Sequence, residues 1–342
     1  MGVSLQLYKF SKILEKISPF IFFLIPISIL YFICPESFYG TWEGSWQGRF
    51  FYFFFLWICT LEIIIGYERL CMPQCGKKRA FILAILFSPT LYVIIANFFG
   101  LNEAIKALAE KNKIYHARLL PLSVEYLVFS ILLCVIVISA YGIPRLDEFA
   151  MSITFLGVIG LIYVIDQIYP AGRFSPFQFM VFPTTNLAQS LLNILGYQTN
   201  LRVHYTSDYG YLAVLSVFDP TNAKFASFGV AWPCAGVESL IIYTLTILLF
   251  LKKDSLTRWQ KVIYFAFGAI ITYLINITRI VLIYLIAIKG GDVWIFHNFY
   301  GPLMSISWIA SYPLLILGIE ALWAKSCETR IRKIYTHTRN IC

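Results

Sequence analysis

The chain has 342 residues, of which 59% are hydrophobic and only 13% are charged, and its mean hydropathy is +0.74. Because about a quarter of the residues of a soluble domain are charged, this composition excludes an ordinary soluble protein and indicates an integral membrane protein. The net charge of +9 then favours Lys and Arg retained on the cytoplasmic side of a membrane over a nucleic-acid partner.

Apolar stretches long enough to cross a bilayer recur along the chain. A hydrocarbon core about 30 Å thick requires about 20 apolar residues in a helix. The first stretch has no signal-peptide cleavage site after it, so we treat it as a retained span. The eight stretches lie near 18–34, 50–66, 80–98, 121–142, 150–169, 234–251, 262–288 and 303–323. The sequence therefore predicts an all-α polytopic membrane protein with a single domain.

The basic residues predict how the chain is oriented. With the N-terminus inside, 17 of the 27 Lys and Arg fall in inner segments, 9 in outer segments and Arg279 within a span. This ratio predicts a protein of the cell membrane with both termini in the cytoplasm. The predicted parts are five N-terminal spans (1–169), an extracytoplasmic region (170–233), a three-span core (234–323) and a basic cytoplasmic tail (324–342). The outer loop 100–119 is the weak point, because its four basic residues would also suit an inner loop.

The extracytoplasmic region 170–233 contains shorter elements. TNLAQSLLNIL (185–195) has an apolar stripe and a Thr or Asn at its start, which predicts a short helix lying in the membrane interface. The segments 211–219 and 224–232 are rich in β-branched and aromatic residues and flank DPTN. They predict a hairpin, or two short extended segments, before the sixth span.

The eight cysteines show no disulfide framework. Cys71 and Cys75 form a close pair in CMPQC, but no second pair or histidine nearby completes a zinc site. We therefore expect a reduced cytoplasmic loop there, and neither a metal nor a cofactor.

Arg279 is the most informative residue, because an arginine inside a span costs about 2.5–3.5 kcal/mol on insertion scales and usually faces a bundle interior or a wet cavity. Asn276, three residues earlier, shares its helix face. A functional role is one interpretation. The other is a structural pairing with a buried carboxylate of Glu62, Asp166 or Glu238.

Cys234 opens the sixth span in WPCAGVESLII. Pro233 suits the first turn of a helix, where unpaired N–H groups stabilise a thiolate. Gly236 leaves room for a substrate backbone, and Glu238 could orient a neighbour although its charge opposes a thiolate. The alternative is that Cys234 is only a small buried hydrophobic residue.

His297, in WIFHNFYG, can shuttle protons near neutral pH, although an isolated interfacial histidine can also lack a role. His204 is a reserve candidate on the outer side, whereas His116 and His337 compete poorly. Cys234, Arg279 and His297 all fall near the outer ends of the last three predicted spans. A Cys and His pair supplies a nucleophile and a base, and an Arg stabilises developing negative charge, so the set suits acyl transfer.

Three motifs in order resemble the exosortase/archaeosortase family of membrane-embedded cysteine enzymes. They are Cys-Ala-Gly at 234–236, Asn276-Ile-Thr-Arg279-Ile, and His297-Asn-Phe-Tyr-Gly301. The resemblance covers roughly 205–320, and the first five spans match only in character. Archaeosortases often have a second Arg at the third position. This chain has His297 there, and a His at that position fits the exosortase pattern. The segment PCAGVESL is also similar to the archaeal subgroup of this family that occurs in ammonia-oxidising archaea.

The resemblance implies a Cys-Arg-His site that processes exported proteins with a C-terminal motif, a transmembrane stretch and a basic tail. The enzyme would cleave near the motif through a thioester and transfer the new C-terminus to an acceptor, such as a membrane lipid. His297 would take the thiol proton and later activate the acceptor, while Arg279 would hold negative charge.

Other functions remain open from the sequence. The same residues could serve an intramembrane protease with water as the acceptor. A transporter could instead have a polar path around Arg279, lined also by Asp166, Glu238 and Glu62, although we find no internal symmetry of the transporter kind. A scaffold with a degenerate site is the third alternative.

Overall fold

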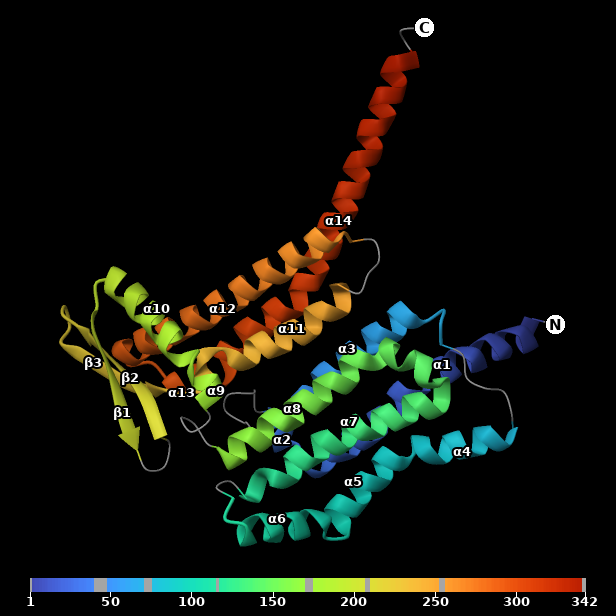
Figure 1. The fold of residues 1–342 in the computed structure, drawn as a ribbon, viewed down its shortest axis with the longest axis horizontal. Coiled ribbons are helices and arrows are strands. Elements are labelled where there is room, and N and C mark those ends of the chain that lie inside the picture. Colours follow the sequence, from blue (N-terminus) through green and yellow to red (C-terminus); the bar gives the residue numbers. More distant parts are fainter. Residues whose placement is uncertain are drawn as a thin grey trace.

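A computed structural model describes residues 2–39, 48–70, 76–114, 117–169, 175–206, 210–251 and 256–339. They form long helices and one small sheet (Figure 1). The helices are α1 (Gly2–Ile33), α2 (Glu36–Tyr39), α3 (Phe51–Gly66), α4 (Gly76–Leu86), α5 (Ser88–Phe98), α6 (Leu101–Lys111), α7 (Leu120–Tyr141), α8 (Ala150–Ile168), α9 (Ser175–Gln178), α10 (Val181–Ile194), α11 (Val237–Leu251), α12 (Arg258–Lys289), α13 (Val293–Ile295) and α14 (Gly301–Arg339). The strands are β1 (Gln198–Thr206), β2 (Gly210–Asp219) and β3 (Lys224–Val230). Shorter turns are η1 (Ala117–Leu119), η2 (Ile143–Phe149), η3 (Trp232–Ala235) and the π-helical η4 (Phe296–Tyr300).

The helices form two groups that meet along α8 and α11. In the N-terminal group α7 packs on α8, and α3 packs on α8 and on α1. In the C-terminal group α11, α12 and α14 pack on one another. The sheet and α10 lie at one end of the molecule, whereas the start of α1 and the end of α14 lie toward the other (Figure 1).

All eight predicted stretches are helical, which confirms the class of fold. Six segments have the length and composition to cross a membrane, counting α4 and α5 together. The helices α3 and α11 have only 16 and 15 residues, so they span about 24 and 22 Å at 1.5 Å per residue. The number of eight spans therefore stays a prediction.

Two boundaries differ from those expected. The stretch 80–98 is broken at Phe87, because Pro89 in the first turn of α5 has no N–H and its ring is incompatible with a preceding helical turn. The helix of the last predicted span, which was expected to end near 323, continues through the predicted tail as α14 to Arg339. The CMPQC segment and His116 lie outside the described residues.

The region 170–233, which the sequence predicted to be extracytoplasmic, contains more structure in its described residues than the sequence indicated. The hairpin is confirmed as β2 and β3, but a third strand, β1, was missed and pairs antiparallel with β2. The expected interfacial helix is α10, which begins four residues earlier than predicted and packs on β1 and β2. Helix α6, between α5 and α7, was also missed, because its many polar residues hid its short amphipathic pattern.

The sheet is fixed to the helices through its apolar face. Ala213, Leu215 and Val217 alternate along β2 and are at most 2% exposed. From α12, the Tyr284 hydroxyl lies 2.8 Å from the Leu215 carbonyl oxygen and 3.2 Å from that of Phe228. The sheet therefore rests on α10 and α12, beside the segments that carry the candidate site.

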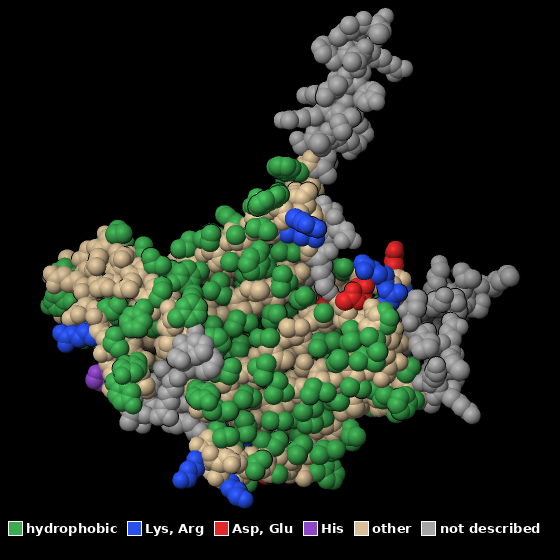
Figure 2. All heavy atoms as spheres, viewed as in Figure 1, with side chains coloured by type: hydrophobic (Ala, Val, Ile, Leu, Met, Phe, Trp, Pro, Cys, Tyr) green, Lys and Arg blue, Asp and Glu red, His purple; other side chains and the backbone are tan. Residues whose placement is uncertain are grey.

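The outer surface of the helices is apolar. Hydrophobic side chains cover most of the helical face in Figure 2, while Lys, Arg, Asp and Glu gather at its margins. Phe32, Phe81 and Ile131 are 83%, 66% and 62% exposed. Large apolar residues in these numbers would be unfavourable in water, so this surface fits a lipid environment.

Candidate active site

Cys234 lies in a turn that precedes α11. The sequence predicts it in the first turn of that helix, and this prediction is wrong. Residues 232–235 form the 3-10 turn η3, and Gly236 follows with φ +84 and ψ 7. A right-handed helix cannot continue through this left-handed conformation, so α11 begins at Val237. The Cys234 N–H donates to the Ala231 carbonyl at 3.0 Å, and the side chain is half-buried.

Two buried side chains from different helices hold the carbonyl groups of this turn. Asn276 of α12 donates from Nδ2 to the Cys234 carbonyl at 3.1 Å. The Thr184 hydroxyl of α10 lies 3.2 Å from the Ala235 carbonyl oxygen and 3.0 Å from the Tyr273 hydroxyl. Asn276 and Thr184 are both 0% exposed. Asn276, which the sequence predicts as a supporting residue, therefore contacts the cysteine turn directly.

Thr184 and Tyr273 were not singled out from the sequence. Tyr273 could have been found, because it lies three residues before Asn276 and is therefore its neighbour on the helix surface. Nothing in the sequence pointed to Thr184, since its contact with residue 235 depends on how α10 packs in the tertiary structure.

Two glycines permit close approaches at the site. A Cβ on Gly236 would lie 2.7 Å from Nδ2 of Asn276, so the turn and α12 touch without room for a side chain. A Cβ on Gly301 would lie 2.6 Å from Cδ of Arg279. The start of α14 therefore packs directly on the stem of this arginine.

Arg279 and His297 interact electrostatically. Arg279 is 0% exposed, and His297 lies in the π-helical segment η4, one turn before Gly301. Burial, and after it the positive charge of Arg279, lowers the pKa of His297 to about 4 from 6.5. The ring is consequently neutral at physiological pH and able to accept a proton.

The three predicted residues are connected through α12. One face of this helix holds Asn276, which contacts the cysteine turn, and Arg279, whose charge reaches His297. Cys234, Arg279 and His297 are separated by up to 63 positions in the chain, and α12 contacts the cysteine turn through Asn276 and acts on His297 through the charge of Arg279. The arrangement supplies a thiol, a neutral imidazole and a buried cation.

One of the carboxylates considered as partners of Arg279 has contacts at the start of α8. Glu62 accepts hydrogen bonds from the N–H groups of Met151 and Ser152 at 2.8 and 3.0 Å, so it caps that helix. Glu238 is 2% exposed and lies within electrostatic range of Tyr163 on α8.

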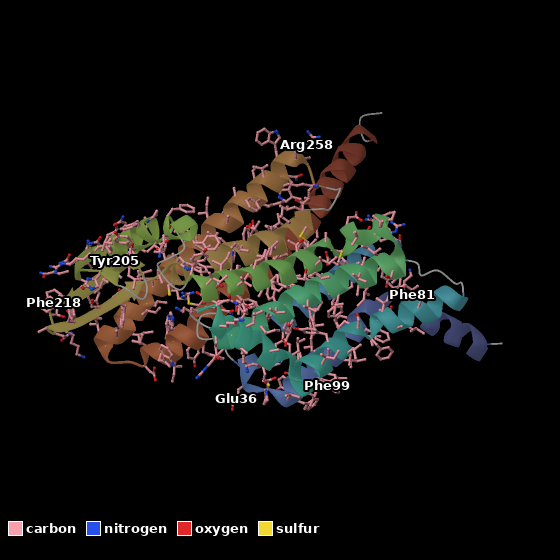
Figure 3. All side chains as sticks on the ribbon, turned by 60° about the horizontal axis from the view of Figure 1, so that its bottom comes forward. Glu36, Phe81, Phe99, Tyr205, Phe218 and Arg258 are labelled. Carbon is pink, nitrogen blue, oxygen red and sulfur yellow. The ribbon has the colours of Figure 1, made fainter. Side chains whose placement is uncertain are left out.

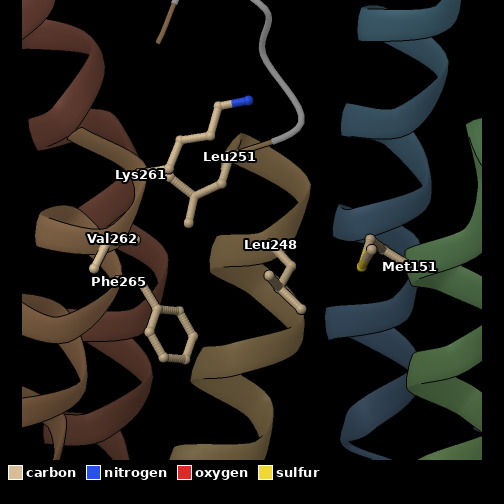
Figure 4. A pocket seen from close by; sticks show the side chains of 6 residues that line it. All are labelled: Met151, Leu248, Leu251, Lys261, Val262 and Phe265. Atoms are coloured by element: carbon tan, nitrogen blue, oxygen red, sulfur yellow. The ribbon is translucent and has the colours of Figure 1, made fainter. Parts of the chain in front are cut away.

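The other candidate features lie away from this set. His204 is exposed on β1. Within the described part of the chain, no group of three or more His, Cys, Asp and Glu residues could hold a metal ion. An apolar pocket of 460 Å³ lies between helices α8, α11 and α12 (Figure 4). It is lined by Met151, Leu248, Leu251, Lys261, Val262 and Phe265. Its residues on α11 follow Cys234 by at least 14 positions, which is about 20 Å of helix, so it is not the candidate active site.

Comparison with known protein families supports the resemblance. The model of the transmembrane exosortase family matches residues 20–315, which include Cys234, Arg279 and His297. The match begins at residue 20, well before 205, so it takes in the N-terminal spans, and it ends at 315. No curated protein and no solved structure matches the chain.

Proposed function

The chain belongs to the transmembrane exosortase family of membrane protein-sorting transpeptidases, and from that premise we propose that Cys234, Arg279 and His297 cleave C-terminal sorting signals and transfer the new C-terminus to an acceptor. The observation that carries this assignment is the shared face of α12. It connects the cysteine turn through Asn276 to the charge of Arg279, and through Arg279 to His297.

The first half of the reaction forms a thioester. His297 accepts the Cys234 thiol proton as the sulfur attacks the carbonyl carbon of the scissile peptide bond. The positive charge of Arg279 stabilises negative charge on the sulfur and on the carbonyl oxygen. When the C–N bond breaks, the proton on His297 passes to the leaving amine, which departs with the transmembrane stretch of the substrate.

The second half transfers the acyl group. His297 accepts the proton of an incoming nucleophile, which attacks the thioester carbonyl; the C–S bond breaks, and the Cys234 thiolate takes the proton back from His297. We propose a membrane lipid as the acceptor, because the site lies at the end of membrane helices. Water as the acceptor would make the protein a protease, and the same residues support both outcomes.

The substrates of the family are exported proteins with C-terminal sorting signals. A signal that ends in an apolar span and a basic tail places its scissile bond at the outer membrane surface. We therefore propose that the sheet end faces outward and that both termini are cytoplasmic, as the distribution of Lys and Arg favours.

The orientation can be tested with two single-cysteine variants whose positions are marked in Figure 3. Tyr205 lies on the sheet, and Arg258 lies at the start of α12. A membrane-impermeant maleimide should label Tyr205→Cys in intact cells and Arg258→Cys only after permeabilisation. The reverse pattern would refute the proposed orientation.

The chemistry can be tested with an exported reporter that carries a short motif, an apolar span and a basic tail from a protein of the same source. Cys234→Ser should lower processing of the co-expressed reporter at least 100-fold, whereas Cys134→Ser, a half-buried cysteine of α7, should leave it unchanged. His204→Ala is the matched control for His297→Ala. Normal processing by Cys234→Ser would overturn the assignment.

Mass spectrometry of the product distinguishes the acceptors. A lipid adduct on the new C-terminus shows transfer, and a free carboxylate shows hydrolysis. A free carboxylate under all conditions, with lipid present, would refute the lipid as the acceptor.

A further inference from the structure

The strand β3 is an edge of the sheet. The strand order is β1-β2-β3, and β3 pairs antiparallel with β2 from Val230 to Lys224. Within the described residues, the backbone of β3 forms hydrogen bonds with no backbone other than that of β2. An edge strand presents a row of N–H and C=O groups that can pair with another chain.

The strand is both fixed and accessible. Ala226 and Val230 are 6% and 4% exposed on its covered face, and the Tyr284 hydroxyl of α12 reaches the Phe228 carbonyl oxygen at 3.2 Å. Phe225 is 64% exposed, and Gly229 is exposed as well. A rigid strand with an open edge binds an extended peptide at little cost in ordering of its own backbone.

The end of β3 leads directly to the nucleophile. Ala231, the residue after the strand, is still extended, with φ −95 and ψ 166. Its carbonyl accepts the Cys234 N–H at 3.0 Å. Neighbouring strands lie about 4.8 Å apart, so a chain paired with β3 would emerge next to the cysteine turn.

We propose that the extended segment just upstream of the scissile bond adds to the free edge of β3 as a fourth strand. This proposal rests on the proposed function and names how the same site recognises its substrate. Main-chain hydrogen bonds would provide the affinity, so binding would tolerate varied side chains along the seven residues that β3 offers.

The direction of the added strand follows from the geometry. The scissile bond must reach Cys234, which lies beyond the C-terminal end of β3, and the transmembrane stretch of the substrate follows that bond. The substrate segment must therefore run parallel to β3, with its upstream residues beside Phe225 and its downstream residues beside Gly229. An antiparallel segment would carry the scissile bond away from the cysteine.

The opposite edge, β1, provides matched controls. Both edges run in the same direction because each pairs antiparallel with β2, but β1 lies about 9.6 Å from β3, two strand spacings away. Gln198 lies in the same row of the sheet as Phe225, through Phe218. Arg202 lies in the same row as Gly229, through Val214. All four positions are exposed.

The test is disulfide cross-linking between Cys234→Ser enzyme and the reporter described above, which carries single cysteines at successive upstream positions. Phe225→Cys and Gly229→Cys are compared with Gln198→Cys and Arg202→Cys. A Cβ at Gly229 meets only Leu212 at 3.7 Å, so this substitution fits. The thermal unfolding midpoint of each variant in detergent shows whether it folds.

Parallel pairing predicts that the best-linked reporter position for Phe225→Cys lies four residues upstream of that for Gly229→Cys, since the two enzyme positions differ by four. Cross-linking from β3 should exceed that from β1 at least tenfold. If the wild-type enzyme processes the reporter, any of three results would overturn the proposal. They are the opposite order of linked positions, equal cross-linking from β1, and no cross-linking from β3. Failure of the wild-type enzyme to process it would refute the proposed function itself.

Discussion

Replacing Gly236 with alanine should disable the cysteine turn for two separable reasons. At φ +84 a residue with a Cβ is strained by about 1–2 kcal/mol. The new Cβ would also lie 2.7 Å from Nδ2 and 2.8 Å from Cγ of Asn276, so the amide must move. Asn276 would then lose its hydrogen bond to the Cys234 carbonyl, which contributes about 1 kcal/mol. Together these effects destabilise the fold by about 2–3 kcal/mol.

The backbone strain and the displaced amide can be measured apart. Gly100 has φ +79 and nothing within 4 Å of an added Cβ, so Gly100→Ala carries the strain alone. Thermal unfolding in detergent should show a lower midpoint for both variants, with the larger decrease for Gly236→Ala. Reporter processing per folded enzyme should fall at least tenfold for Gly236→Ala and stay within twofold for Gly100→Ala.

A Gly236→Ala enzyme that processes the reporter at the wild-type rate would refute the reasoning, because the amide would then have no part in placing Cys234. Equal loss of processing in Gly100→Ala would refute it as well, since strain remote from the site would be sufficient.

Four further predictions follow, three on the contacts around the site and one on Glu62. The lowered pKa of His297 keeps its ring unprotonated, and so free to accept a proton, until the pH falls to about 4, so processing should persist below pH 6.5 and be lost near pH 4. In Arg279→Gln the pKa of His297, followed by NMR, should rise but stay below its ordinary value of 6.5, since burial is the larger cause; no rise would contradict the electrostatic effect of Arg279. Thr184→Val should reduce processing about fivefold because the hydroxyl contact with the cysteine turn is lost, which is worth about 1 kcal/mol. The Thr184 hydroxyl also bonds the Met180 carbonyl of its own helix at 2.7 Å, and Thr278→Val, which removes only a bond of that second kind, should leave processing unchanged. Glu62→Ala should destabilise the fold by about 1–2 kcal/mol through loss of the cap on α8, which lowers the unfolding midpoint. Processing per folded enzyme should stay intact. A loss of processing in this variant would favour a polar path that includes Glu62.

The helical membrane fold could be predicted because its signal is local. A run of apolar residues long enough to cross a bilayer has to satisfy its backbone within the helix, so hydropathy alone located all eight helical stretches. The elements missed, β1 and α6, are short and rich in polar residues. Their formation depends on partners, because β1 needs β2 beside it and α6 needs the ends of α5 and α7.

The sequence by itself determined the membrane class, the family motifs and the identity of Cys234, Arg279 and His297 as candidates, because residue type and spacing carry that chemistry. Only the tertiary structure decided how the turn that holds Cys234, the helix that holds Arg279 and the segment that holds His297 are arranged. The turn before α11 depends on a left-handed Gly236 pressed against Asn276, and Thr184 reaches residue 235 from 51 positions away. Contacts of this kind depend on how α10, α12 and α14 pack against one another, and no local pattern in the chain encodes that packing.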